Sequence, residues 1–475
     1  MNKRLTFFLM ILVLVPAAGI LYLLGTPHLV SISPEANARN VAAGSQLRLK
    51  FSRRMQAQSV SGRLHIDPVQ AGSFQWEGST LVFIPTEPWP SGATVKVRLD
   101  GGARAAGLLA FPMRGTAAWS FSIGQPRMLY LYPSDRAANL YLMNPFSGTK
   151  LKVTDSQAGI LEYSVNATGT TAYYDVKNGF GGTSLYRIDG LDRLDASQPI
   201  TQTLPTPTLL LDCGQSLCRN PQISPQGDFL AYEKTGLAGG QDPPYPRVWL
   251  LSLPEDPSAR PGETKLAGLP DHQTMQPSWS PSGLLSYYDS SRAAFAIQDP
   301  QDGQAVFFPN QTGQPGAWDP SSTYYLAPEI SYVTTGQPGN TSGTVIGNSH
   351  LMRFDRLDGK VEDLTQLDSL EDVAPAYSPD GKWIALARKY LDTAHWTPGR
   401  QVWVMGPDGK QARQLTDNPY YNHYDFSWSP DSKWLAYVRF DETSLTQPPE
   451  IWMVEMESTQ TQKLVTGGYS PRWIP

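Results

Sequence analysis

The stretch Pro375-Ala-Tyr-Ser-Pro-Asp-Gly381, followed by Trp383-Ile-Ala-Leu386, decides the fold because the chain repeats it. Clear copies are Pro221-Gln-Ile-Ser-Pro-Gln-Gly227, Pro277-Ser-Trp-Ser-Pro-Ser-Gly283 and Phe426-Ser-Trp-Ser-Pro-Asp-Ser432. Weaker copies are Glu162-Tyr-Ser-Val-Asn-Ala167, Gly316-Ala-Trp-Asp-Pro-Ser-Ser322 and a shortened one, Gly468-Tyr-Ser-Pro-Arg-Trp473. The copies are roughly 40–60 residues apart, a period typical of a propeller, a solenoid or an array.

Each repeat contains four predicted strands. An alternating apolar run such as Phe229-Leu-Ala-Tyr232 follows the Ser-Pro turn, and an aliphatic–aromatic pair such as Val402-Trp403 comes next. A shorter run such as Arg413-Gln-Leu-Thr416 completes the repeat. Short aromatic and aliphatic runs bounded by turn residues are strand signals. Four antiparallel strands per repeat make one blade of a β-propeller, whose radial packing leaves only short edges.

The two ends of the repeat region complement each other. The runs at Met128–Tyr132, Leu140–Met143 and Leu151–Thr154 look like strands two to four of a blade that lacks its first strand. The final run, Tyr469-Ser-Pro-Arg-Trp473, looks like a first strand with no blade of its own. We therefore expect the C-terminal strand to close a seven-bladed propeller over residues 125–475. Without the weak repeat at Gly316 the number would be six.

The phrase Pro-x-Trp-Ser-Pro-Asp-Gly-x-x-Ile-Ala, followed later by Ile451-Trp452, resembles the repeat of TolB-type propellers. The same repeat occurs in the propeller domain of prolyl oligopeptidases. The resemblance is specific for fold and implies partner binding in the cell envelope, without saying which partner. The recurring tryptophans, such as Trp279 and Trp428, are expected to pack between blades, since repeated aromatics per blade are a signature of the fold.

The N-terminal segment predicts a membrane anchor. Residues 5–24 are almost wholly apolar, and about 20 helical residues span a bilayer core. Lys3 and Arg4 precede the segment, which predicts a cytoplasmic end at residues 1–4 and an extracytoplasmic location for the rest, as a single-pass protein of the plasma membrane. The alternative is a signal peptide cleaved near Pro16-Ala-Ala-Gly19, which would give a secreted protein.

Residues 30–124 predict a small β-sandwich. Runs such as Leu47-Arg-Leu-Lys-Phe51 and Thr94-Val-Lys-Val-Arg-Leu99 alternate apolar and polar residues, with turn signals between them. Together with Phe83-Ile-Pro85 and Pro90-Ser-Gly92, they resemble the bacterial Ig-like domain of cell-surface proteins. The resemblance implies a spacer that lifts the propeller off the membrane.

Composition and cysteine content agree with an all-β extracytoplasmic protein. The chain holds 41 glycines and 41 prolines, and its net charge of −5 disfavours a nucleic-acid partner. The only two cysteines, Cys213 and Cys218, lie five residues apart. They are too few for a four-ligand zinc site, so a local disulfide in an oxidising compartment is expected.

The candidate binding face follows from strand parity. Connections between second and third strands, and between the fourth strand and the next repeat, lie at one end of the propeller, which we call the upper face. Several of these loops are long, including 235–246, 389–400 and 441–449, and long loops on a rigid scaffold concentrate binding residues. Aromatic side chains there predict a recognition surface, unless they only pack the loops themselves. The candidate face is Phe180, Tyr245, Asp271, His272, His395, Trp396, Arg400, Tyr420, Tyr421, His423 and Tyr424.

No catalytic, cofactor or metal motif supports an enzyme. The chain has no Gly-x-Ser-x-Gly elbow, no His-Glu-x-x-His and no P-loop. We therefore expect a non-enzymatic module that binds an envelope protein or peptide. Two alternatives stay open: a propeller hydrolase or lyase acting on a glycan, and an envelope assembly or sensory subunit.

Overall fold

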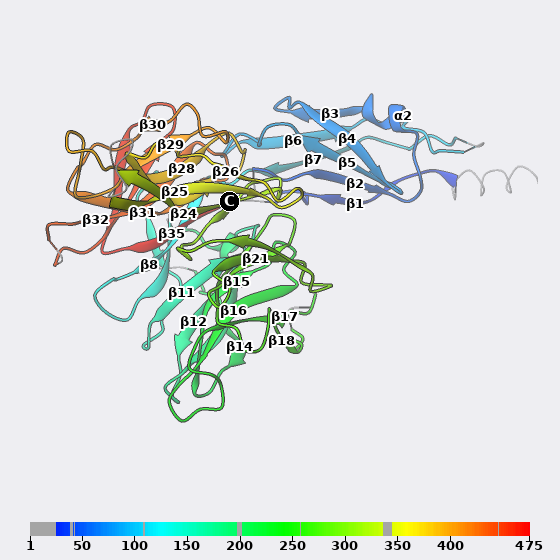
Figure 1. The fold of residues 1–475 in the computed structure, drawn as a ribbon. Helices are drawn as coiled ribbons and strands as arrows, with labels where there is room; N and C mark the ends of the chain where they lie inside the picture. Colours follow the sequence, from blue (N-terminus) through cyan, green and yellow to red (C-terminus); the bar gives the residue numbers. More distant parts are fainter. Residues whose placement is uncertain are drawn as a thin grey trace, which may run out of the picture. The chain divides into compact units, whose positions relative to one another are not determined.

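The computed structural model describes residues 25–475 except 39–40, 42, 108–109, 197–201, 257, 336–343 and 445. The chain divides after Gln125 into two compact units, and each is described by itself. Nearly all regular structure in both units is β-strand (Figure 1).

The first unit is a sandwich of two antiparallel sheets. One sheet has the order β1-β2-β5-β4 and the other β3-β6-β7, with the short helix α2 before β3. The bounds are β1 Leu29–Ser33, β2 Leu47–Phe51, α2 Ala57–Ser61, β3 Leu64–Asp67, β4 Gly72–Glu77, β5 Thr80–Pro85, β6 Thr94–Leu99 and β7 Ala117–Ser122. The predicted strands are present, and β3 and α2 are additions that no sequence pattern indicated.

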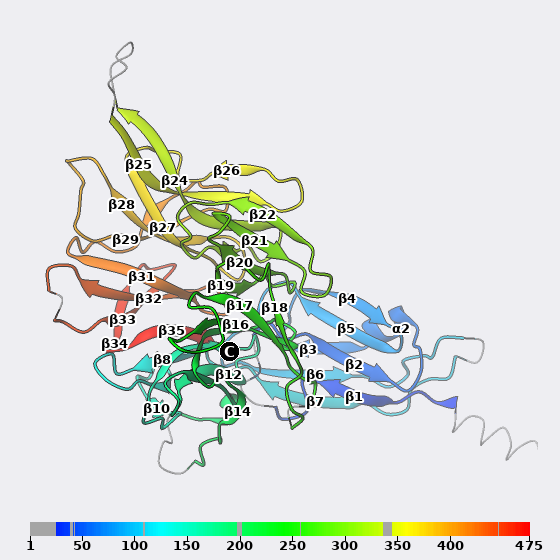
Figure 2. The same ribbon diagram turned by 60° about the horizontal axis from the view of Figure 1, so that its bottom comes forward.

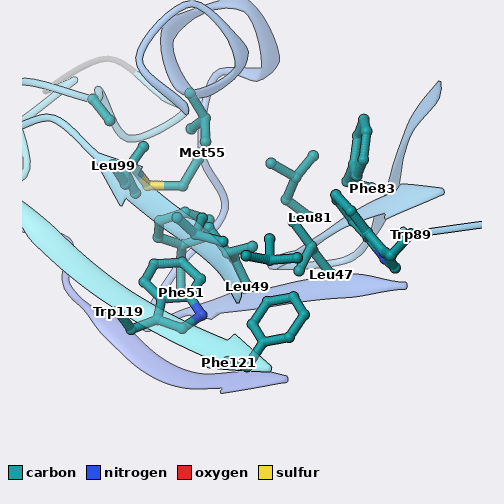
Figure 3. Packing of buried hydrophobic residues seen from close by; sticks show 14 of the residues in the cluster. Leu47, Leu49, Phe51, Met55, Leu81, Phe83, Trp89, Leu99, Trp119 and Phe121 are labelled. Atoms are coloured by element: carbon teal, nitrogen blue, oxygen red, sulfur yellow. The ribbon is translucent and has the colours of Figure 1, made fainter. Parts of the chain in front are cut away.

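The core of this unit lies between its two sheets. Phe83, Trp89 and Phe121 are buried beside Leu47 and Leu81 (Figure 3). The Phe121 ring meets the edge of the Trp89 ring at a centroid distance of 6.3 Å, an arrangement that aromatic pairs prefer. The indole Nε1 of Trp89 donates to the carbonyl oxygen of Ser45 at 2.7 Å, so its polar atom is paired inside the core.

In the described part of the second unit, the strands form seven four-stranded antiparallel sheets. We number them sheets 1 to 7. Sheet 1 contains β8 Arg127–Tyr132, β9 Asn139–Met143, β10 Lys150–Lys152 and β35 Tyr469–Ile474; sheet 2 contains β11 Ile160–Val165, β12 Thr171–Lys177, β13 Thr183–Asp189 and β14 Thr208–Asp212; sheet 3 contains β15 Ser216–Ile223, β16 Phe229–Gly236, β17 Arg247–Ser252 and β18 Thr264–Leu266; sheet 4 contains β19 Thr274–Trp279, β20 Leu285–Asp289, β21 Ala294–Gln298 and β22 Ala305–Pro309. Sheet 5 contains β23 Ala317–Trp318, β24 Tyr324–Thr335, β25 Thr344–Asp355 and β26 Val361–Asp363; sheet 6 contains β27 Leu370–Tyr377, β28 Ile384–Tyr390, β29 Gln401–Met405 and β30 Arg413–Gln414; sheet 7 contains β31 Tyr421–Trp428, β32 Trp434–Asp441, β33 Glu450–Glu455 and β34 Thr461–Thr466. A 3₁₀ turn, η1 Leu191–Arg193, follows β13.

Sheet 1 combines the two ends of the unit. Its first strand, β35, pairs antiparallel with β8, as the unmatched terminal runs predicted. The register differs from the sequence interpretation, however. Trp473 pairs with Met128 as Trp428 pairs with Leu435, so Ser470 and Pro471 correspond to Asp425 and Phe426 and not to the Ser-Pro of the turn.

Seven buried hydrophobic clusters join the seven sheets in cyclic order. Leu131 of sheet 1 packs in one cluster with Ile188 of sheet 2, and Tyr130 of sheet 1 packs in another with Ile451 of sheet 7. The five remaining clusters join sheets 2–3, 3–4, 4–5, 5–6 and 6–7. Each sheet therefore buries both of its faces against neighbours, as a radial array of sheets requires.

The repeated serine has a local role in the turn between the first and second strands. In sheet 6, the Ser378 hydroxyl accepts the backbone N–H of Trp383 at 3.0 Å and donates to Asp380 Oδ1 at 2.7 Å. The backbone N–H of Gly381, at φ 71°, donates to the carbonyl oxygen of Ser378. Glycine reaches this left-handed conformation at little steric cost, which explains its place in the repeated phrase.

Among the described residues, no helix is both long and apolar enough to cross a membrane. The predicted span at residues 5–24 lies outside the described residues.

The closing strand offers a stability test. Trp473 is buried in the cluster between sheets 7 and 1, whereas Trp396 is 54 % exposed on a loop. Trp473→Ala should lower the free energy of unfolding by about 3–5 kcal/mol, because it leaves a cavity in the cluster that joins the chain ends. Denaturant unfolding of the purified protein measures this.

Trp396→Ala is the matched control and should change the free energy of unfolding by less than about 1 kcal/mol. Equal effects of the two substitutions would contradict the role assigned to the closing strand.

Candidate binding face and central channel

The upper loops of sheets 5 to 7 are joined by backbone hydrogen bonds. The N–H of Leu391 donates to the carbonyl oxygen of Ser369 at 2.8 Å, and that of Gly399 to the carbonyl oxygen of Pro419 at 2.9 Å. The N–H of Glu442 donates to the carbonyl oxygen of Tyr420 at 2.9 Å. Four connections, which follow β26, β28, β30 and β32, therefore form one continuous loop surface.

Two candidate aromatics on this surface face solvent. Trp396 is 54 % exposed and Tyr420 is 56 % exposed. The ammonium of Lys389 lies 4.6 Å from the Trp396 ring centroid, which supports one side of the indole. Leu367, on the loop that Leu391 contacts through Ser369, is 58 % exposed. The sequence analysis missed Leu367 because a single leucine in a short loop carries no signal.

His395 is also exposed on this surface. Its Nδ1 lies 2.8 Å from Asp392 Oδ1, and its ring centroid lies 5.4 Å from that of Tyr390. Both partners belong to its own loop or to the strand that leads into it, so the side chain is held in place while its outer edge stays free.

Other candidate residues of sheets 6 and 7 support the fold instead of facing solvent. His423 is 1 % exposed, and its Nδ1 lies 2.7 Å from the carbonyl oxygen of Arg400. Burial lowers the pKa of His423 to about 4, so the ring is neutral near pH 7. His423 therefore cannot contact a partner at the surface, which corrects the sequence interpretation. The sequence does not reveal this burial, because His423 lies near the start of β31 and only the fold decides which way its imidazole ring points.

Arg400 and Tyr421 support the loops. Arg400 Nε donates to Glu371 Oε1 at 2.9 Å, and the guanidinium of Arg439 lies 4.1 Å from the Tyr421 ring centroid. The same guanidinium lies 3.9 Å from the Trp452 ring centroid, so it stands between two aromatic rings. Arg400 and Tyr421 are half-buried, so they hold the loops in position and expose little surface to a partner.

The remaining candidates belong to sheets 2 to 4. Phe180 is largely exposed, Tyr245 is half-buried and Asp271 is exposed. His272 Nδ1 lies 2.7 Å from Asp289 Oδ2, which ties its loop to β20. Within the described residues, no hydrogen bond, ion pair or ring contact connects these four side chains to the loops of sheets 5 to 7. The eleven candidates therefore do not form a single cluster.

A disulfide joins Cys213 and Cys218 at the upper face, where the chain passes from β14 to β15. It links the end of β14 to β15 and so staples sheet 2 to sheet 3. The backbone N–H of Cys218 donates to Thr183 Oγ1 at 2.6 Å, which adds a third strand to this contact.

A cavity of about 520 Å³, which we call the channel, lies between the sheets and is lined mostly by their first strands. Most of these strands contain a β-bulge two to three residues before their end, and the first bulged residue has a positive φ. These residues are Asn220, Gln276, Ala374, Asp425 and Ser470, with φ between 49° and 57°. A non-glycine residue rarely adopts this conformation, and strained backbone of this kind clusters at functional sites.

The bulge residues were missed by the sequence analysis, although a signal is present. Asn220, Gln276, Ala374 and Ser470 are each followed by proline, just before the repeated phrase. Tyr424 also lines the cavity, so it belongs to the channel and not to the outer loop surface. Its neighbour Asp425 accepts a hydrogen bond from Arg472 Nη1 at 2.7 Å across sheets 7 and 1.

Sheets 2 and 3 carry a charged cluster beside this channel. Asp175 is completely buried on β12, and its Oδ1 accepts the backbone N–H of Glu162 at 2.7 Å. Glu162 Oε2 accepts the backbone N–H of the bulge residue Asn220, and Arg219 lies 3.3 Å from Glu162 and 3.8 Å from Asp175. Burial raises the pKa of Asp175 to about 7 and also raises that of Glu162. Two perturbed acids side by side are a pattern found at active sites as well as in structural networks.

Among the described residues, no group of three or more His, Cys, Asp or Glu side chains is arranged to hold a metal ion.

Comparison with known proteins identifies the class of the first unit. Residues 25–123 match the family of bacterial Ig-like domains. No curated protein matches the chain in sequence. The second unit has the packed four-stranded antiparallel sheets that are typical of a β-propeller.

Solved structures similar to the chain include TolB from Acinetobacter baumannii, at 12% identity and a TM-score of 0.42, covering 95% of this chain and 99% of that one. A putative TolB from Agrobacterium tumefaciens has 15% identity and a TM-score of 0.39, and covers 74% of this chain and 100% of its own. Oligogalacturonate lyase from Vibrio parahaemolyticus has 12% identity and a TM-score of 0.40, with 66% and 74% covered. TolB proteins and an enzyme both occur among these structures, so they assign no role.

The acid cluster predicts a pH dependence of stability. Unfolded aspartate has a pKa near 3.9, so between about pH 4 and pH 7 only the folded state keeps the Asp175 proton. This contribution to stability is fully present below about pH 4 and is lost as the pH rises through about 7. Relative to Asp175→Asn, the free energy of unfolding of the native protein should fall by about 2 kcal/mol from pH 5 to pH 8.

Denaturant unfolding of both proteins at several pH values measures the difference. The asparagine keeps the shape and the acceptor oxygen but does not titrate, so parallel pH profiles would show that Asp175 is ionised throughout.

Proposed function

We propose that this chain is a non-enzymatic, extracytoplasmic protein whose propeller binds an envelope protein or peptide on its upper face. Residues 5–24 anchor it in the plasma membrane as a single span, with residues 1–4 in the cytoplasm; cleavage of this segment as a signal peptide, giving a secreted form, is the alternative. The Ig-like domain acts as a spacer between membrane and propeller.

The observation that carries the proposal is the exposure of Leu367, Trp396 and Tyr420 on adjoining loops; we call these three residues the upper patch. Its three loops are fixed to one another by backbone hydrogen bonds. Large apolar side chains held rigidly in solvent are typical of interaction sites, and Trp and Tyr dominate binding energies at such sites. A loop surface that is already ordered also loses little conformational entropy on binding.

We further propose that the seven sheets are the blades of one closed seven-bladed ring. The seven shared clusters, one for each neighbouring pair of sheets, support this number. The weak repeat at Gly316 contributes sheet 5, whose first strand β23 has two residues. The ring matters for function because it gives the upper loops a rigid base.

A second candidate is a hydrolase or lyase acting on a glycan. The specific observation in its favour is the neighbouring pair Glu162 and Asp175, both with raised pKa values. Against it, Asp175 is completely buried and its carboxylate already accepts a backbone hydrogen bond. Only Glu162 could reach a bound substrate, and a glycosidase of the usual kind needs two such carboxylates.

Capture from detergent-solubilised envelope tests the binding proposal. The bait is the purified protein, compared with a variant that carries Leu367→Ala, Trp396→Ala and Tyr420→Ala. We expect a partner retained by the native bait to be weakened at least tenfold by the triple substitution, since loss of about 1.4 kcal/mol already gives a factor of ten.

The matched control is Leu357→Ala with Val361→Ala, two exposed apolar residues at the opposite end of sheet 5. A partner retained equally by all three proteins, or no partner at all, would contradict the assignment. In that case glycan hydrolysis and elimination assays with native protein and Glu162→Gln decide the second candidate.

A further inference from the structure

Sheet 5 contains a two-stranded ribbon that no other sheet has. Its strands β24 and β25 each have 12 residues and pair without interruption from Tyr324–Asp355 to Thr335–Thr344. Their neighbours are much shorter: β23 pairs only with Tyr325 and Leu326, and β26 only with Met352 to Phe354. The two strands extend together beyond the other strands of the unit (Figure 2).

The free part of the ribbon has two open edges. It comprises the pairs from Glu329–His350 to Thr335–Thr344, none of which pairs with a third strand. The direction of the backbone groups follows from Leu351, whose carbonyl oxygen accepts Leu364 N–H and whose own N–H donates to Thr365 Oγ1. The backbone N–H and C=O groups of Leu351 therefore point away from β24, and so do those of every second residue along β25.

In an antiparallel pair, two residues that lie directly opposite each other both direct their backbone groups inward or both direct them outward. Thr334 and Val345 are partners, and they lie six residues along each strand from Pro328 and Leu351. Their backbone N–H and C=O groups accordingly point out of the two edges. The partners Tyr332 and Gly347 have the same orientation, and among the described residues neither has a backbone hydrogen-bond partner outside the ribbon.

The ribbon lacks the usual protection of a free edge. Natural edge strands carry charges, especially lysine, or proline, which discourage pairing with another chain. Glu329 stands at the base of the free part, where its carboxylate accepts the outward Ile330 N–H, but no charged residue occurs from Ile330 to Ser349. The strand residues themselves include no proline after Pro328. An isolated two-stranded ribbon is also marginally stable in water, and a third and fourth strand would stabilise it.

We propose that this ribbon pairs with the same ribbon of a second copy of the chain, edge to edge, to form a four-stranded antiparallel sheet across a two-fold axis. Antiparallel pairing of identical edges is self-complementary, which is what a two-fold interface requires. Two copies of a chain with net charge −5 repel each other, but the part of the ribbon beyond Glu329 can approach a second copy without bringing charged side chains together. This inference is independent of the upper patch and of its partner.

Proline substitution tests the pairing at each edge. Thr334→Pro removes an outward N–H from β24, and Val345→Pro removes one from β25, while the hydrogen bonds between β24 and β25 do not use either group. Sedimentation velocity of the full chain in density-matched detergent, from about 1 to about 100 μM, measures the oligomeric state. We expect the native chain to form dimers, and one of the two substitutions to weaken association at least tenfold and so to identify the pairing edge.

Thr334→Val and Val345→Thr are the matched controls, because they keep the backbone N–H and should leave association unchanged. Far-ultraviolet circular dichroism and the unfolding midpoint check that each proline variant remains folded. A native chain that stays monomeric at all concentrations would overturn the proposal. Dimers that persist in both proline variants would overturn it too, since the contact would then lie elsewhere in the chain.

Discussion

The pairing of β35 with β8 is the constraint on which the second unit depends. A ring of sheets has no free face only when the last sheet meets the first, and here the strand that completes sheet 1 comes from the opposite end of the chain. The cluster around Tyr130, Ile451 and Trp473 then buries the final junction. Every other sheet is a local product of consecutive strands, so closure is the one long-range step that the architecture requires.

Charged side chains near the upper face hold neighbouring strands together. Arg388 binds both carboxylate oxygens of the buried Asp372, with Nε–Oδ1 and Nη2–Oδ2 distances of 2.7 Å, and its guanidinium lies 5.1 Å from the Trp403 ring centroid. Thr365 donates a further hydrogen bond to Asp372. A buried ion pair is tolerated when its hydrogen-bonding capacity is satisfied in this way. The ion pair of Arg388 with Asp372 thus fixes the strands, whereas the upper patch consists of Leu367, Trp396 and Tyr420.

The channel and the upper patch have different chemistry. The channel wall consists of backbone bulges with amide side chains such as Gln222 and Gln276 and the ion pair of Arg472 with Asp425, whereas the upper patch is apolar. Strained bulges recur in the first strands of sheets 1, 3, 4, 6 and 7, and the charged cluster of Glu162, Asp175 and Arg219 lies where sheets 2 and 3 meet. At the equivalent position β16 carries another acid, Glu233, which accepts the Gln276 N–H, whereas β20 and β28 carry Tyr288 and Ala387.

The sequence by itself determined the repeat, the four strands of each sheet and the closure by the C-terminal strand, because alternation and turn residues act over short distances. The tertiary structure alone decided which side chains face outward. A bulge adds one residue to a first strand and reverses the alternation beyond it, so Tyr424 enters the channel and the Ser470-Pro471 pair occupies a bulge instead of a turn. His423 is buried and Leu367 is exposed for a related reason: their surroundings come from neighbouring sheets, which no local pattern records.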